Sequence, residues 1–155
     1  GGGAGGERRP ARPAPRAGER VARVTSAEEG ASAGWRSLLA ELRRPGWSLL
    51  VFAADGDGPA LVRLAEACEG VVRVRTVPGP GAADGEGALP GPLRDPGGLL
   101  AKGLGARPGD WLLIRPDGYL AASGRLPGTD PAAVAESLGL RLGSRTPARH
   151  STARS

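Results

Sequence analysis

Cysteine, methionine and aromatic residues are scarce in this 155-residue sequence. It holds one cysteine (Cys68), no methionine, three Trp, one Tyr and one Phe. A single thiol excludes both an internal disulfide framework and a two-cysteine redox motif, and we expect a cytoplasmic protein. Because aromatic residues are scarce and methionine is missing, any core must be built mainly from Leu, Val and Ala. Because an unprocessed translation product starts with Met, we expect a fragment or processed product of a longer protein.

Long hydrophobic runs are also missing. No apolar stretch approaches the roughly 18 to 20 residues that cross a membrane. The N-terminus lacks the apolar segment of a signal peptide. We therefore expect no membrane partner. The length of 155 residues suits one domain with its own core.

The net charge of +5 is concentrated at the two ends of the chain. Residues 1–20 hold five Arg and two Glu, and residues 141–155 hold four Arg and no acid, which leaves −2 for residues 21–140. These basic ends carry no aromatic residue on which a nucleic-acid base could stack. We therefore expect no nucleic-acid partner.

Composition also divides the chain into segments. Both ends are of low complexity and rich in turn-forming residues. We expect a disordered basic linker at 1–18, a folded domain at 19–142 and a disordered basic tail at 143–155. Three glycines near the N-terminus match the spacing of a dinucleotide-binding fingerprint, but no strand precedes them and no helix follows, so the match reflects composition.

Hydrophobic periodicity predicts alternating strands and helices from residue 47 onward, after a helix over 35–42 that Pro45-Gly46 ends. The expected strands cover 47–52, 71–77, 111–114 and 119–122. The expected helices lie between Pro59 and Gly70, Asp95 and Gly105, and Asp130 and Gly139, with a flexible loop at 78–92. The resulting order is β-α-β-α-β-β-α, which is the order of a two-layer, thioredoxin-like α/β domain whose sheet faces are covered by helices.

One segment resembles a thioredoxin active site. In that family a strand delivers a Cys-Gly-Pro-Cys motif to the start of a helix, and here Asp57-Gly58-Pro59-Ala60 occupies those positions. Asp110 stands where the cis-proline of thioredoxins is expected. Because both cysteines are missing, no thiolate is present to attack a disulfide. An active thiol oxidoreductase is therefore excluded in favour of a thioredoxin-like domain without redox cysteines.

A more specific resemblance covers residues 13–142. The stretches PRAGERVARV (15–24), SLLAELRRPGWSLLVF (37–52) and DPGGLLAKGLGARPGDWLLIRPDGYLA (95–121) resemble, in this order and spacing, the C-terminal thioredoxin-like domain of FAD-dependent aromatic hydroxylases. That family includes the phenol hydroxylases and the actinobacterial polyketide-tailoring flavoprotein monooxygenases. The family's FAD-binding region, with its strand, glycine fingerprint and helix, has no counterpart in these residues.

The resemblance implies a role in a larger enzyme. The chain would be the C-terminal structural or dimerisation domain of an FAD-dependent, NAD(P)H-using aromatic monooxygenase, with no activity of its own. Its partners would be the FAD-binding portion of the same polypeptide and a second copy in a homodimer. FAD and NAD(P)H are implied for the parent enzyme, and no cofactor for this chain. The alternative is a free-standing, redox-inactive thioredoxin-like interaction module.

No catalytic, cofactor-binding or metal-ligating residue is predicted, although several were candidates. Cys68 lies on an apolar helix stripe and is interpreted as a small buried hydrophobe, and His150 lacks companion metal ligands. Asp55, Asp57 and Asp110 could meet near the vacated redox site, but without a nucleophile or a nearby His we interpret them as turn and cap residues.

Two side chains receive more specific predictions. Asp57 is placed to cap the helix that begins at Pro59, a role usually worth about 0.5 to 2 kcal/mol. Arg115, in the turn of the hairpin, has two open interpretations. It forms an ion pair with the FAD-binding portion or a partner subunit, or it is a solvated charge worth less than about 1 kcal/mol.

Overall fold

A four-stranded mixed sheet forms the centre of the structure, a computed structural model that describes residues 14–23, 26–79 and 89–142. The strand order is β2-β1-β3-β4, in which β1 and β2 are parallel and β3 runs antiparallel to both β1 and β4. The strands are β1 (Trp47–Phe52), β2 (Val72–Val77), β3 (Asp110–Ile114) and β4 (Leu120–Arg125).

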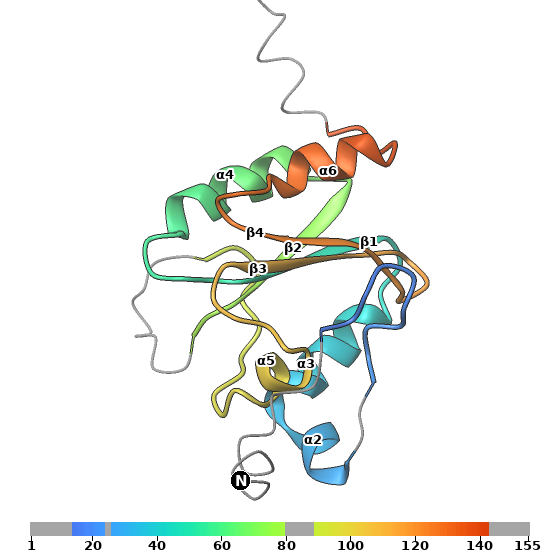
Figure 1. The fold of residues 1–155 in the computed structure, drawn as a ribbon, viewed down its shortest axis with the longest axis vertical. Helices are drawn as coiled ribbons and strands as arrows, with labels where there is room; N and C mark the ends of the chain where they lie inside the picture. The colour runs from blue at the N-terminus through green and yellow to red at the C-terminus, as the bar shows by residue number, and fades with distance from the viewer. Residues whose placement is uncertain (1–13, 24–25, 80–88, 143–155) are drawn as a thin grey trace, which may run out of the picture.

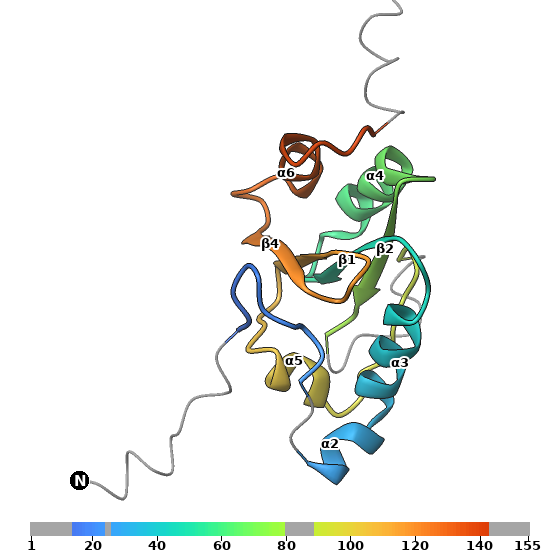
Figure 2. The ribbon, with the colours of Figure 1, turned by 90° about the vertical axis from the view of Figure 1, so that its right-hand side faces the viewer.

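Helices cover both faces of this sheet. Figures 1 and 2 show α4 and α6 on one face, with α2, α3 and α5 on the other. From Trp47 onward the order is β-α-β-α-β-β-α, so the predicted thioredoxin-like α/β class is confirmed. The helices are α2 (Ala27–Ala31), α3 (Ala33–Leu42), α4 (Gly58–Cys68), α5 (Leu99–Gly103) and α6 (Pro131–Ser137).

The two faces of the sheet bury separate hydrophobic clusters because successive strand residues point to opposite sides. The face under α4 and α6 packs Leu49, Val51, Trp111, Leu113, Leu61, Leu64 and Cys68. The opposite face packs Leu50, Phe52, Leu112, Ile114, Trp35, Leu38 and Leu100. Leu and Val supply most of both clusters, as the low aromatic content requires.

The chain before α2 is part of the folded domain. Val21 is 1% exposed and belongs to the cluster under α3 and α5. The N–H of Gly18 donates to Leu120 O at 2.8 Å, and Leu120 N donates to Glu19 O at 2.8 Å, so this segment covers the start of the edge strand β4. The domain boundaries expected at 19 and 142 stay predictions.

Local signals place most of the helix ends. Ser32 accepts from Trp35 N at the start of α3, and Asp130 accepts from Ala132 N at the start of α6, which confirms the predicted start of that helix. The indole Nε1 of Trp35 donates to Leu99 O at 3.2 Å, which ties α3 to α5.

One predicted helix start was wrong. Asp95-Pro96 was expected to open the helix that leads to Leu104, but α5 begins only at Leu99. Gly98 has a φ of 73°, a left-handed conformation that interrupts the helical path. Asp95 nevertheless caps α5 from a distance, because its two carboxylate oxygens accept from the N–H groups of Leu100 and Ala101 at 3.0 Å each.

Candidate functional site

The junction of β1 and α4 corresponds to the thioredoxin active-site position. Asp57 is the N-cap residue of α4, as predicted, but its side chain makes no cap hydrogen bond, and this part of the prediction was wrong. Its Oδ2 accepts from Ala54 N at 2.9 Å instead. Asp57 has helical backbone angles, whereas a capping side chain needs an extended backbone, and Pro59 has no N–H to offer in the first turn.

The loop before β3 lies beside this junction, as the sequence predicted for Asp110. Gly109 N donates to Phe52 O at 2.6 Å, which holds the loop against the end of β1. The carboxylate of Asp110 is already engaged. It accepts from Arg107 N and from Arg125 Nη1, each at 2.8 Å.

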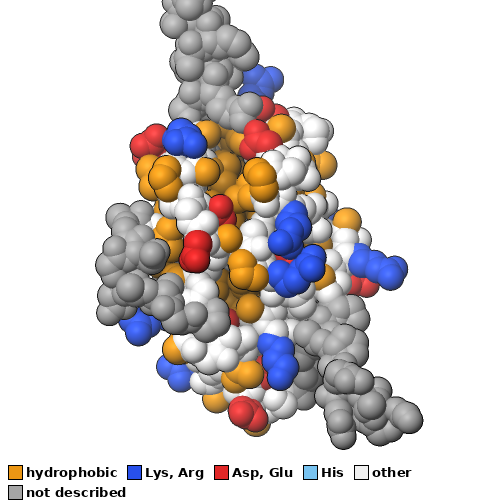
Figure 3. All heavy atoms as spheres, turned by 60° about the vertical axis from the view of Figure 1, so that its left-hand side comes forward, with side chains coloured by type: hydrophobic (Ala, Val, Ile, Leu, Met, Phe, Trp, Pro, Cys, Tyr) orange, Lys and Arg blue, Asp and Glu red, His pale blue; other side chains and the backbone are white. Residues whose placement is uncertain are grey.

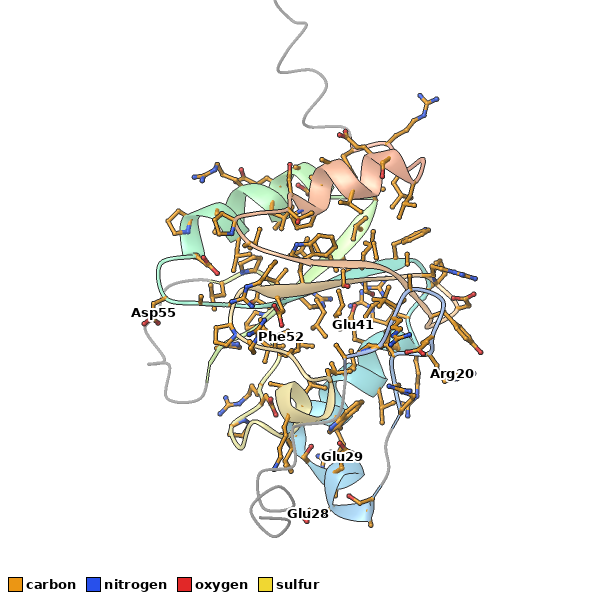
Figure 4. The ribbon with its side chains drawn as sticks, in the orientation of Figure 1. Arg20, Glu28, Glu29, Glu41, Phe52 and Asp55 are labelled. Carbon is orange, nitrogen blue, oxygen red and sulfur yellow. The ribbon has the colours of Figure 1, made fainter. Side chains whose placement is uncertain are left out.

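Two of the three aspartates therefore serve local structure. Asp57 and Asp110 bind different donors in their own turns, and Asp55 is exposed at the edge of the molecule and points outward (Figure 4). Within the described residues, no group of three or more His, Cys, Asp and Glu side chains is placed to hold a metal ion. The face that comes forward when the left-hand side of Figure 1 is turned toward the viewer carries hydrophobic, acidic and basic side chains next to one another (Figure 3).

The remaining nucleophile and metal candidates lie elsewhere. Cys68 is 1% exposed at the end of α4, inside the cluster under α4 and α6, so its interpretation as a buried hydrophobe is consistent with its position. His150 lies outside the described residues.

Arg115 lies in the turn between β3 and β4, where several polar contacts are gathered. Its Nη2 pairs with Asp117, and both side chains are nearly half exposed. The guanidinium groups of Arg20 and Arg115 lie 5.1 Å and 6.0 Å from the centre of the Tyr119 ring. The Tyr119 N–H lowers the pKa of Asp117, and the hydrogen bond and charge of Arg115 lower it further.

A buried ion cluster between α3 and β2 was not predicted. The carboxylate of Glu41 is 6% exposed and accepts from the Nε of Arg73 and, at 2.9 Å, from the Nε of Arg75. Arg73 also donates to Ser48 Oγ and to the carbonyl oxygens of Glu41, Arg44 and Pro45 at the end of α3. The alternation in β2 predicts that Arg73 and Arg75 share a face of the sheet, but the partner on α3 had no signal of its own.

Two opposing effects act on Glu41. Burial alone would raise its pKa, but the hydrogen bonds from Arg73 and Arg75, together with their positive charges, outweigh burial and hold the pKa below its ordinary value of 4.5. Because each of its partners is engaged in holding α3 on the sheet, we interpret this cluster as structural.

Comparison with known proteins gives one informative match. The chain matches none of the protein-family models. It is 44% identical over 97 residues to 6-methylpretetramide 4-monooxygenase of Streptomyces rimosus. The matched stretch makes up 62% of this chain and 16% of that relative, so the chain spans only a small part of the monooxygenase it resembles. In the described part of the chain, no helix is long and apolar enough to cross a membrane.

Proposed function

We propose that this chain is the C-terminal structural domain of an FAD-dependent, NAD(P)H-using aromatic monooxygenase. The observation that carries this proposal is the 44% identity over 97 residues to a monooxygenase of which the match spans 16%. A domain that makes up such a small fraction of an enzyme can support the enzyme's fold or assembly while the reacting groups lie in the rest of the polypeptide. Its partners would be the FAD-binding portion of the same polypeptide and, in a dimer, a second copy.

The β1–α4 junction does not fit FAD. In a βαβ unit the dinucleotide diphosphate binds where the first strand leads into its helix, against free N–H groups and close-packed glycines. Here Asp55 and Asp57 place two carboxylates at that turn, and Pro59 removes one N–H donor from the first turn of α4. Carboxylates repel a diphosphate. In the proposed enzyme, FAD would be bound outside this chain.

The junction also lacks the groups for thiol chemistry. Asp57 and Ala60 stand at the two positions where a thioredoxin has its cysteines. Cys68 lies two turns further along α4 and is buried. This arrangement supports a role in structure and assembly for the domain.

The proposal predicts that the isolated chain has no flavin activity. A recombinant 155-residue chain mixed with FAD should leave the flavin fluorescence unquenched and should not oxidise NADPH. A flavoprotein of known FAD affinity, measured in parallel, is the positive control for flavin binding. Stoichiometric FAD binding by the isolated chain would show that the cofactor site lies within it and would contradict the proposal.

A further inference from the structure

The exposed end of the β3–β4 hairpin has a built arrangement of two arginines around one aromatic ring. Arg20 comes from the N-terminal segment and Arg115 from the hairpin, and both guanidinium groups lie within 6.0 Å of the Tyr119 ring centre. A guanidinium above a ring keeps its N–H groups free at its edge, where a carboxylate can accept two of them. We call Arg20, Arg115 and Tyr119 the arginine face.

The backbone fixes the position of this face. Gly18 N donates to Leu120 O, Leu120 N donates to Glu19 O, and Val21 N donates to Gly118 O at 3.1 Å. These three hydrogen bonds flank Arg20 and hold it beside the hairpin. Since the buried side chain of Val21 anchors the same segment, its backbone is already ordered before a partner binds.

The hydrogen-bonding capacity of the face exceeds its use. A guanidinium carries five N–H donors. Within the described residues, the guanidinium of Arg115 donates only to Asp117, and the guanidinium of Arg20 stacks on the Tyr119 ring. The acid that pairs with Arg115 is itself nearly half exposed. The two arginines therefore retain donors that a carboxylate from another surface can use.

The location of the face indicates which surface that is. Arg20 lies at the opposite end of the sheet from Asp55, far from the thioredoxin-type junction (Figure 4). The described chain begins at Ala14, four residues before Gly18 is bound to β4. Any polypeptide that precedes this segment is therefore attached next to the arginine face. Covalent attachment raises the effective concentration of the preceding polypeptide, into the millimolar range where the linker is short, so that even a weak contact is formed.

We propose that the arginine face docks onto acidic side chains of the polypeptide portion that precedes this domain. This inference rests on the proposed function, because it takes the chain to be the C-terminal part of a longer enzyme. It adds to that function the surface that sets the orientation of the domain. It also favours the first of the two interpretations of Arg115, as a docking residue.

Chemical modification of arginine tests this directly. Phenylglyoxal is applied to the full-length polypeptide and to the 155-residue chain, and the rate at each arginine is followed by peptide mass spectrometry. We expect Arg20 and Arg115 to react on the order of tenfold more slowly in the full-length protein, because a docked guanidinium is covered most of the time. Arg63, exposed on α4 across the sheet, is the matched control and should react equally in both.

Three outcomes would overturn the docking proposal. In the first, Arg20 and Arg115 react at the same rate in the full-length protein and in the 155-residue chain. In the second, Arg63 is protected in the full-length protein as strongly as Arg20 and Arg115. In the third, the isolated chain itself becomes protected as its concentration rises, which would indicate that a second copy covers the face. The visible absorption of the same full-length sample reports on the proposed function separately. A flavin spectrum with an unprotected arginine face contradicts only the docking, whereas arginine protection without flavin contradicts only the flavoenzyme.

Charge reversal provides a second test in the full-length protein. Docking should slow backbone hydrogen exchange in the hairpin peptides of the full-length protein. R20E/R115E should restore the faster exchange of the undocked domain, whereas R63E should not. The circular dichroism of each variant checks that the domain is folded. Unchanged exchange in folded R20E/R115E would contradict the docking.

Discussion

Glu41 on α3 is paired with Arg73 on β2, and Arg73 in turn donates to the carbonyl oxygen of Glu41 in the last turn of α3 and to that of Arg44 just after the helix. One guanidinium thus binds both a buried carboxylate and a helix end, where a positive charge also favours the helix dipole. The pair joins a helix to a neighbouring strand more than thirty positions away in sequence. It is the main polar connection between α3 and the sheet in the described residues.

The first prediction is that Glu41→Gln destabilises the domain. The amide cannot neutralise two partly buried arginines, so the free energy of unfolding should fall by roughly 2 to 4 kcal/mol. Urea denaturation followed by circular dichroism measures the change. Glu69→Gln, at an exposed position after α4, is the matched control and should change stability by less than about 0.5 kcal/mol. Equal stability of the two variants would show that the cluster is energetically neutral.

The second prediction concerns pH. The pKa of Glu41 is lower in the folded state than its ordinary value of 4.5, so the unfolded chain binds a proton more readily. The stabilisation is therefore complete above pH 4.5 and is lost as the pH falls through the folded-state pKa. The fall in urea midpoint between about pH 6 and about pH 3 should be smaller for Glu41→Gln than for the wild type. An equal fall in both proteins would assign the acid sensitivity to other carboxylates.

The third prediction concerns close packing of β4 on Trp111. A Cβ atom at Gly124 would lie 2.6 Å from Cζ2 of Trp111 and 3.1 Å from the Cβ of Thr129. Gly124→Ala should therefore cost roughly 1 to 3 kcal/mol and shift the Trp111 fluorescence. Gly97→Ala, where a Cβ meets nothing within 4 Å, is the control. If the two variants unfold at the same urea concentration, the ring has room to move.

The fourth prediction concerns Cys68. A thiol that is 1% exposed reacts only when the domain opens, so Ellman's reagent should label the native protein slowly and the unfolded protein at once. The protein should also fail to catalyse the reduction of insulin by dithiothreitol. Insulin reduction that disappears in Cys68→Ser would contradict a redox-inactive domain.

Much of the fold could be predicted because its signals are local. The apolar run WSLLVF predicted β1 with the bounds it has, and the β-branched, alternating run at 71–77 predicted β2, which begins one residue later at Val72. Pro116-Asp117-Gly118 predicted the hairpin turn, since these residues favour turn positions. Helix α2 was missed because it has only 5 residues and no apolar stripe, and its N-cap bond from Glu29 N to Ser26 is its main local support.

The polar details could not be predicted because they depend on tertiary contacts. Asp57 looked like a cap, but the backbone angles that turn its side chain to Ala54 depend on how the loop is packed. The stacking of Arg20 on Tyr119 depends on pairing across about one hundred positions, which no short pattern encodes. The same limitation applies to Glu41 and its two arginines.

The proposed role of this domain is that of the non-catalytic part of a flavin-dependent monooxygenase. Its most direct test is the mass and visible absorption spectrum of the native polypeptide that carries this sequence, purified from its source cells. We expect a protein several times heavier than the 15.6 kDa of these residues, with the absorption bands of bound flavin. A colourless polypeptide of about that mass would contradict the claim and would make the chain a free-standing, redox-inactive interaction module.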